Sequence, residues 1–174
     1  CPEEVMCFIE IVPGDTVKYE IDKQSGYLKI DRPQLYSNVV PFLYGFIPQT
    51  FCGDEVAKLA SVLHGDRDPL DIVVLCERPI PHGDILLKAI PVGGLRMIDK
   101  GEADDKIIAV LVGDAAYSYI KSIDDIPEML MNRLKHYFKT YKLSPETGYT
   151  PVEIAAEYDK SKAHEVINAS RKDY

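Results

Sequence analysis

Three aspartates lie close together in the segment 64–71, which reads HGDRDPLD, and an apolar run follows at 72–75. They are Asp66, Asp68 and Asp71. Two unit charges about 4 Å apart repel each other by about 4 kcal/mol at an effective dielectric constant of about 20, so carboxylates crowd together where a cation or a proton offsets them. Oxygen ligands presented in this way favour magnesium or manganese over zinc. The same residue types are common in solvated turns, and the segment alone leaves both interpretations open.

A second acidic segment, 97–106, contains Asp99 and Asp104 and follows another apolar run. Together the two segments supply at least five carboxylates, which strengthens the case for a metal site. Glu10 and Glu20 each interrupt a segment that is otherwise apolar or aromatic. Basic and hydroxyl side chains accompany these acids at Lys18, Arg32, Tyr44, Lys106, Tyr141 and Lys142. Taken singly, each of them is more typical of a solvated surface or of core packing than of a site.

The length of 174 residues suits one domain, and we expect a single domain over residues 1–174. Lysine and arginine number 20 against 28 aspartates and glutamates, and this net charge of −8 argues against a nucleic-acid-binding protein. No apolar run approaches the roughly 20 residues of a membrane span, so we expect no membrane association. The four cysteines form no C-x-x-C pair. Free thiols in a reducing compartment are the simplest interpretation, and the predicted location is the cytoplasm.

Most of the first two thirds of the chain is expected to form β-strands. Alternating apolar and polar residues predict strands at 17–21 and 27–32, which the turn 22–26 joins into a hairpin. The aromatic-rich segment 41–48 is interpreted as irregular. Further strands, separated by Gly, Pro and Asp, are expected at 7–12, 72–75, 85–92, 94–98 and 106–112. Short strands at this spacing favour a closed barrel over a sheet built from βαβ units.

The last third changes to a helical period. Asp124 or Asp125 is predicted to cap a helix that has Pro127 in its first turn. One apolar face of this helix carries Leu130, Leu134, Tyr137, Phe138 and Tyr141. The capping-box sequence Thr150-Pro151-Val152-Glu153 predicts a second helix that runs to about residue 169. The chain is therefore expected to be one α+β domain.

Taken together, these segments resemble the soluble, family I inorganic pyrophosphatases. The D-x-D-P-x-D segment 66–71 is the most specific match, and the segments 18–23, 44–48, 92–99 and 137–142 fit the same family. The resemblance fades beyond about residue 143. It implies a five-stranded, OB-like closed β-barrel with two main C-terminal helices packed on it. The implied activity is Mg-dependent hydrolysis of inorganic pyrophosphate to two orthophosphates, by a metal-activated water that attacks directly in line.

The resemblance also implies a role for each candidate residue. Asp68 corresponds to the general base that orients and deprotonates the attacking water. Ligands of several magnesium ions per subunit, with manganese as an alternative, are implied at Asp66, Asp71, Asp99 and Asp104. Substrate-binding positions are implied at Lys18, Arg32, Tyr44, Lys106, Tyr141 and Lys142. Glu10 and Glu20 fall on other active-site positions, and the implied assembly is a homo-oligomer, either a hexamer or a dimer.

Three other classes of protein remain open on the residues alone. A phosphoryl-transfer enzyme of haloacid dehalogenase type needs a D-x-D-x-T motif, but Leu70 occupies its last position here. A non-catalytic oligonucleotide-binding barrel fits poorly with the net charge of −8. A structural cation-binding protein would bind metal without releasing phosphate. Departures from the family pattern, such as Val40 in place of a tyrosine and Lys100 in place of a second acid, remove no residue that the chemistry requires.

Overall fold

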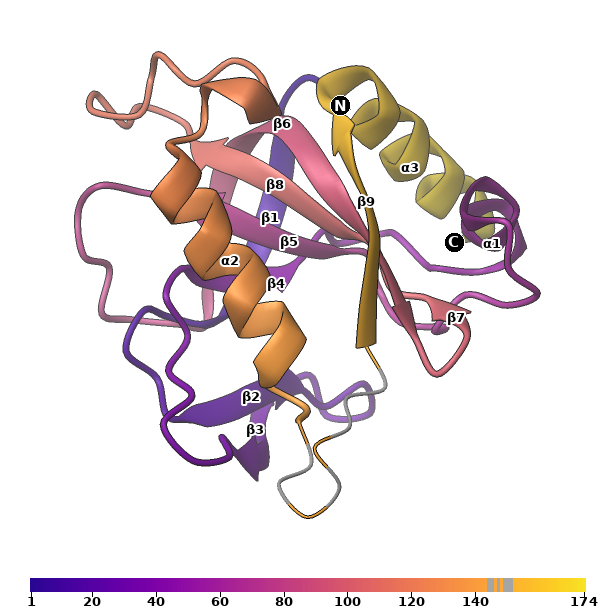
Figure 1. Cartoon of the computed structure of the whole chain (residues 1–174), viewed down its shortest axis with the longest axis horizontal. Coiled ribbons are helices and arrows are strands. Elements are labelled where there is room, and N and C mark those ends of the chain that lie inside the picture. Colours follow the sequence, from indigo (N-terminus) through magenta and orange to yellow (C-terminus); the bar gives the residue numbers. More distant parts are fainter. Residues whose placement is uncertain (144–145, 147, 149–151) are drawn as a thin grey trace.

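The structure is a computed structural model of the whole chain, and it describes residues 1–143, 146, 148 and 152–174. Within this part of the chain, five strands pair in a closed ring. In spatial order they are β1 (Val5–Ile11), β4 (Leu43–Phe46), β5 (Asp71–Leu75), β8 (Lys106–Leu111) and β6 (Ile85–Asp99), which returns to β1 (Figure 1). The β5–β8 pair is parallel, and the other ring pairs are antiparallel. The predicted α+β class is confirmed.

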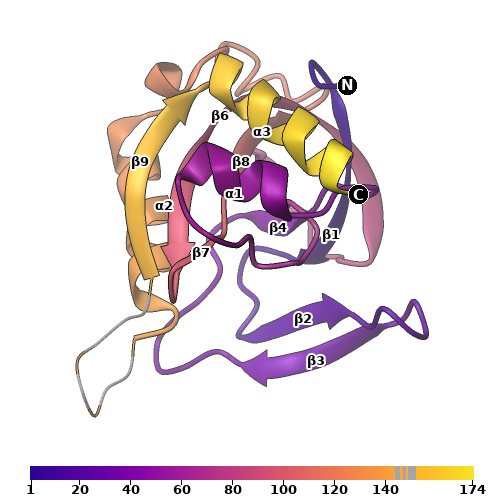
Figure 2. The ribbon, with the colours of Figure 1, turned by 90° about the vertical axis from the view of Figure 1, so that its right-hand side faces the viewer.

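Two further strands and one ribbon complete the β structure. Strands β7 (Glu102–Ala103) and β9 (Val152–Asp159) both pair with β6. Strands β2 (Val17–Ile21) and β3 (Leu28–Pro33) form a two-stranded sheet of their own. This ribbon lies below the ring in both views (Figures 1 and 2). The chain therefore presents two β units that face each other.

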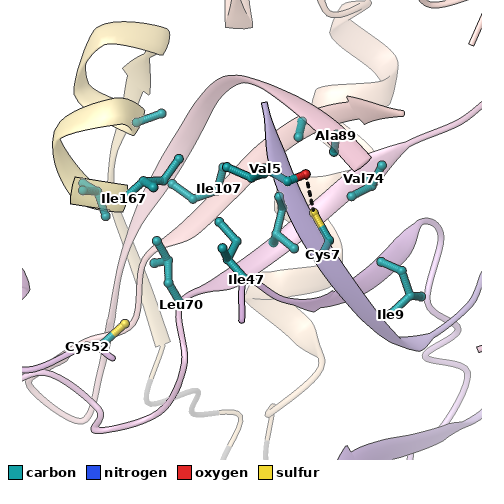
Figure 3. Packing of buried hydrophobic residues seen from close by; sticks show 14 of the residues in the cluster. Val5, Cys7, Ile9, Ile47, Cys52, Leu70, Val74, Ala89, Ile107 and Ile167 are labelled. Atoms are coloured by element: carbon teal, nitrogen blue, oxygen red, sulfur yellow. Dashed lines mark hydrogen bonds between the residues drawn. The ribbon is translucent and has the colours of Figure 1, made fainter. Parts of the chain in front are cut away.

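An inner apolar layer fills the ring. Every ring strand contributes to it, with Cys7, Leu43, Ile72, Ala89 and Ile107 as examples. Helices α1 (Asp54–Ala60) and α3 (Lys160–Asp173) extend this layer through Val56 and Ile167. Figure 3 shows the packing of this layer. Both helices therefore bury an apolar face against the residues of the ring.

An outer apolar layer lies beneath helix α2 (Glu128–Thr140). It joins Val73 and Ile108 of the ring to Leu134 and Phe138 of the helix. The strands β5 and β8 are thus buried on both faces, which explains why their sequences are nearly continuous apolar runs. The helix ends beside the open edge of the ring, and the residues that follow it reach the candidate site.

Several strand predictions agree with the structure and two do not. Strand β2 has the predicted bounds, and the expected strands at 7–12, 27–32, 72–75 and 106–112 lie within two residues of those observed. The interpretation of 41–48 as irregular is wrong for β4, which pairs with β1 and β5. The predicted break between 85–92 and 94–98 is also wrong, because β6 continues through a bulge between Pro91 and Gly93.

The glycines of β6 serve close packing and do not end the strand. A Cβ on Gly93 would lie 2.6 Å from the carbonyl oxygen of Tyr158, and a Cβ on Gly94 would lie 2.4 Å from the Tyr158 ring. Strand β9 therefore approaches β6 more closely than any larger residue would allow. The two glycines, which suggested a break in the strand, instead permit this close contact.

The first predicted helix exists, but its start differs from the prediction. Pro127 precedes α2, and neither predicted aspartate caps it. Asp124 and Asp125 belong to a 3-10 turn (Ile123–Asp125). The Asp125 carboxylate accepts the N–H groups of Lys121 at 2.8 Å and Ser122 at 2.9 Å, so it stabilises this turn.

The second predicted helix is wrong over its first half. Thr150 and Pro151 of the supposed capping box lie outside the described residues, and Val152 and Glu153 belong to strand β9. Pairing along β6 overrides the helix preference of the alanines and glutamates in this segment. The helix begins only at Lys160, where the Asp159 carboxylate accepts the N–H of Lys162 at 2.8 Å. Among the described helices, none has the length and apolar character needed to cross a bilayer.

Candidate active site

A cavity of about 460 Å³ opens where one edge of the ring faces the β2–β3 ribbon. This edge holds the first residues of β5 and β8 and the last residues of β4 and β6, because those strands run in opposite directions. The predicted site residues that line it are Glu10, Lys18, Glu20, Tyr44, Asp66, Asp68, Asp71, Asp99, Asp104, Lys106, Tyr141 and Lys142. Side chains that are distant in the sequence therefore share one polar cavity.

Lys106 lies at the buried centre of this cavity, with 1% of its surface exposed. Its ammonium donates to Asp104 and, at 2.5 Å, to Oδ2 of Asp71. The Tyr44 hydroxyl donates to the same oxygen at 2.5 Å. Burial alone lowers the pKa of Lys106, but the Asp104 and Asp71 carboxylates outweigh it and raise that pKa. Lys106 therefore remains an ammonium at neutral pH.

Backbone pairing brings the two acidic segments together. The N–H of Asp66 donates to the carbonyl of Ala103 at 3.1 Å, and the N–H of Ala103 donates to that of His64 at 3.0 Å. Burial, followed by the negative charge of Asp104, raises the pKa of Asp66 to about 9. Burial is also the main cause that raises the pKa of Asp71. A nearby cation stabilises the charged form of buried carboxyls whose pKa is raised in this way.

A tight hairpin carries the second acidic segment. Lys100 and Gly101 form its two-residue turn with φ values of 51° and 89°, the left-handed conformation that a type I′ turn requires. Asp99 precedes the turn and forms an ion pair with Lys142, while Asp104 follows the turn. Among the described residues, Oδ1 of Asp99 is buried without a hydrogen-bond partner. One carboxylate oxygen of the site is thus left uncompensated.

Asp68 lies on an exposed loop whose backbone is fixed by hydrogen bonds. Its backbone N–H donates to Oδ1 of Asp66 at 3.1 Å, and Arg67 between them has a left-handed φ of 63°. Its carbonyl accepts the N–H of Cys52 at 2.8 Å. The Asp68 side chain forms an ion pair with Lys23. The carboxylate is therefore accessible to solvent while its backbone is fixed.

The ribbon supplies much of the positive charge. Lys18 Nζ lies 3.0 Å from Oδ2 of Asp31 and 3.4 Å from Oε2 of Glu20. Arg32 is paired with Lys18 across the ribbon, but it is not among the residues that line the cavity. Its Nη1 donates to Asp31 at 2.6 Å, and its Nη2 is buried with no partner in the described part of the chain. Arg32 thus lies on the strand next to Lys18, and the structure does not bring it into the cavity as predicted.

Glu10 connects the ring to the ribbon. Its Oε1 accepts the N–H of Ile21 at 2.7 Å, across the space between β1 and β2. Burial raises the pKa of Glu10 to about 7, although the Ile21 hydrogen bond opposes the shift and the Asp71 charge adds to it. This glutamate is 7% exposed, so it belongs to the interior of the site and not to an outer strand face.

The carboxylates do not form a ready-made group of metal ligands. Over residues 1–143, 146, 148 and 152–174, no three acidic, histidine or cysteine side chains gather closely enough to hold a metal ion. Asp71 and Asp104 are instead paired with Lys106. The donor set nevertheless fits a divalent cation, because a cation would stabilise the charged form of Asp66, whose pKa is raised, and would give the buried Oδ1 of Asp99 a partner that it lacks among the described residues.

Some cavity residues were not predicted. They include Lys23, Gln49, Thr50, Glu102 and Tyr174. Lys23 contacts the Asp68 side chain, and Thr50 accepts the N–H of Leu70 at 2.9 Å. Lys23 lies in the segment 18–23, which resembles the family, but its position in a charged turn gave no reason to assign it a role. The contribution of Thr50 depends on packing between segments that are 20 residues apart.

Crowded carboxylates, a buried ammonium and phenol hydroxyls in one cavity are typical of an enzyme site that handles a small polyanion together with cations. Comparison with known proteins identifies the family. The inorganic pyrophosphatase family profile matches residues 7–174. A Chlamydia caviae inorganic pyrophosphatase is 50% identical in an alignment that covers 99% of this chain and 84% of that protein.

Other relatives agree. Soluble inorganic pyrophosphatase 1 of Arabidopsis thaliana is 39% identical over 90% of this chain and 70% of its own length. The crystal structure of the Thermus thermophilus inorganic pyrophosphatase superposes with a TM-score of 0.86 and 32% identity, over 100% of this chain and 92% of that one. The chain therefore belongs to the inorganic pyrophosphatase family, of the soluble type. It is an enzyme, and its reaction is the hydrolysis of inorganic pyrophosphate.

Proposed function

We propose that the chain hydrolyses pyrophosphate by direct, in-line attack of water, with Asp68 as the general base. Asp68 is the accessible carboxylate of the D-x-D-P-x-D loop, and its backbone is held by Asp66 and Cys52. A fixed carboxylate that faces solvent can orient a water and accept its proton. No covalent phosphoenzyme is part of this proposal, because direct attack requires only positioning and charge neutralisation.

The substrate oxygens are bound, in this proposal, by the cationic and phenolic residues around the cavity. These are Lys18, Tyr44, Lys106, Tyr141 and Lys142, which line the cavity, and Arg32, which lies beside Lys18 on the neighbouring strand. Ammonium groups neutralise phosphoryl charge, and phenols donate hydrogen bonds without adding charge. Lys142 and Lys18 now bond to Asp99 and Asp31, so substrate oxygens would compete with these carboxylates for the two ammonium groups.

We propose Mg²⁺, with Mn²⁺ as an alternative, as the metal held by Asp66, Asp71, Asp99 and Asp104. When bound, such ions neutralise phosphoryl oxygens and lower the pKa of a coordinated water. Two observations support this: the raised pKa of Asp66, whose charged form lacks a compensating cation, and the buried Oδ1 of Asp99, which has no hydrogen-bond partner among the described residues. Glu10 and Glu20 add further negative charge at the boundary between ring and ribbon.

The wider proposal covers the whole chain. We infer one pyrophosphatase domain over residues 1–174, an OB-like barrel built on the strand ring, and a homo-oligomer in the cytoplasm. The match of the family profile to residues 7–174 supports the single domain, and the assembly and the location follow from the resemblance to the family. Sedimentation of the purified chain tests the assembly, and a monomer at micromolar concentration would contradict it.

The convergence of twelve predicted residues on one cavity is the observation that carries the proposed mechanism. The test is phosphate release from pyrophosphate by the purified chain, with Mg²⁺ and in the presence of a chelator. We expect release with Mg²⁺ and almost none without it, and slower release from ATP. Equal rates with and without metal would contradict the metal requirement. Trapping of a phospho-aspartate would contradict direct attack.

A further inference from the structure

A buried ion pair lies behind the cavity and outside its lining. Arg96 of β6 grips both oxygens of Asp105, with Nε 3.0 Å from Oδ1 and Nη2 2.9 Å from Oδ2. The Arg96 side chain is 12% exposed and that of Asp105 is 0% exposed. Tyr158 of β9 donates its hydroxyl to Oδ2 of Asp105 at 3.3 Å, and its ring lies 5.7 Å from the Arg96 guanidinium carbon. We call these three residues the Arg96 cluster.

The Arg96 cluster adjoins the residues that present charge to the cavity. Asp105 stands between Asp104 and Lys106 in the chain. Asp104 and Lys106 line the cavity and bond to each other, whereas Asp105 points away from them to Arg96. A bidentate contact fixes a carboxylate in both position and rotation. The contact between Asp105 and Arg96 therefore fixes the backbone conformation at residues 104–106. This conformation directs the side chains of Asp104 and Lys106 into the cavity.

The same arginine also reaches the other acidic segment. Its Nη1 donates to the carbonyl of Leu59 in α1. The chain leads from there to His64 and Asp66, which pair through their backbones with Ala103. Arg96 thus holds both acidic segments. It holds segment 97–106 through Asp105, and it holds segment 64–71 through helix α1.

Stability alone does not account for a buried pair of this kind. Apolar residues of similar volume often replace a buried ion pair with no loss of stability, because desolvation of the charges offsets their attraction. Geometry is what such a replacement loses. A planar guanidinium with five donors in a fixed fork can hold a carboxylate and a backbone carbonyl at defined angles, which an apolar side chain cannot do.

We propose that Arg96 and Asp105 are positioning residues, which set the spacing of Asp66 and Asp104 for divalent cations without touching the substrate. This inference rests on the proposed metal-dependent function. Loss of the pair leaves the cavity carboxylates in place but allows them to vary in position. The expected result is weaker cation binding. Partners behind metal ligands typically contribute about 10- to 100-fold to metal affinity.

The test is direct titration of the full chain with Mn²⁺, in which free Mn²⁺ is measured by electron paramagnetic resonance without pyrophosphate. Arg96→Lys keeps the charge and loses the fork, and Asp105→Asn keeps the shape and loses the charge. The double variant Arg96→Met with Asp105→Leu restores apolar packing, so it remains informative if a single variant does not fold. We expect all folded variants to bind Mn²⁺ about tenfold more weakly or worse.

Val5→Ala is the matched control. Val5 is 3% exposed and belongs to the inner apolar layer of the ring. It pairs with Ala89, which lies toward the end of β6 that is distant from Asp99. This variant loses core packing and is expected to keep the Mn²⁺ affinity of the wild type. Wild-type affinity in the folded double variant, or an equal loss in Val5→Ala, overturns the inference. Absence of Mg-dependent phosphate release by the wild type would instead refute the proposed function.

Discussion

Asp71 and Lys106 are direct partners in the parallel β5–β8 ladder, and Nζ of Lys106 lies 2.5 Å from Oδ2 of Asp71. Each is the first residue of its strand. The register of the ring therefore brings a carboxylate and an ammonium together at its open edge. Asp104 bonds to the same ammonium, so one buried cation compensates two acids.

Lys106→Met should destabilise the metal-free protein by about 3–5 kcal/mol, because it leaves Asp71 and Asp104 buried without their cation. We expect added Mg²⁺ to restore part of this loss. Urea denaturation with and without Mg²⁺ measures both effects. Lys135→Met is the control, since it removes a more exposed ion pair to Glu157 and should cost about 1 kcal/mol or less. Equal losses in the two variants would refute a special role for Lys106.

Asp68→Asn should leave the fold intact and reduce turnover by about 10²- to 10⁴-fold, the usual contribution of a general base. The side chain is exposed and contacts Lys23, so little stability depends on it. Steady-state phosphate release and thermal unfolding measure the two properties. The control is Asp54→Asn, an exposed aspartate of α1 that lies outside the cavity. Turnover of Asp68→Asn within a few-fold of the wild type would rule out its role as base.

Asp173→Ala should destabilise the protein by about 1–2 kcal/mol. The Asp173 carboxylate accepts the N–H groups of Gly53, Glu55 and Val56 at 3.0, 2.9 and 3.0 Å, and so caps helix α1 from the end of α3. Urea denaturation measures the loss. Asp159→Ala removes a cap that accepts one N–H within α3, so it should cost less. A smaller effect for Asp173→Ala than for Asp159→Ala would contradict this account.

The stability contributed by Asp114 should disappear in acid. Burial disfavours its charged form, but the N–H groups of Glu77 at 2.7 Å and Tyr117 at 2.8 Å outweigh burial and lower its pKa. The folded-state pKa of Asp114 lies below its unfolded-state pKa of about 3.9. The stabilisation by Asp114 is therefore fully present at pH values above about 3.9. It is lost as the pH falls through the lower, folded-state pKa.

The comparison with Asp114→Asn isolates this effect. The difference in unfolding free energy between wild type and variant should be constant from neutral pH to about pH 5 and shrink below about pH 4. Urea denaturation across this range measures it. A difference that grows in acid would have the wrong sign and would contradict the assignment.

The sequence predicted the elements whose patterns are local. The alternation at 17–21 and the apolar stripe of α2 appear in the structure much as expected. Segment 152–159 was predicted as helix because the capping-box sequence at 150–153 opens it, but its pairing with β6 decides its conformation. Strand β4 was missed for the same reason, since its four residues are held by neighbours on both sides.

The candidate site divides in a similar way. Asp66, Asp71 and Asp104 could be proposed because crowded carboxylates are unusual in any fold. Lys23 and Arg96 lie in segments that resemble the family, but no role for either side chain could be assigned from the sequence. Their importance depends on contacts with residues 45 and 9 positions away, Asp68 and Asp105.

The β2–β3 ribbon has its own ladder and shares no rung with the ring. It contributes Lys18, Glu20 and Lys23 to the cavity, whereas the ring and its loops contribute most of the acidic side chains. Its link to the ring through Glu10 is a single hydrogen bond. Substitutions in the ribbon are therefore expected to change the charge that faces a bound polyanion while the ladder of the ring strands keeps its register.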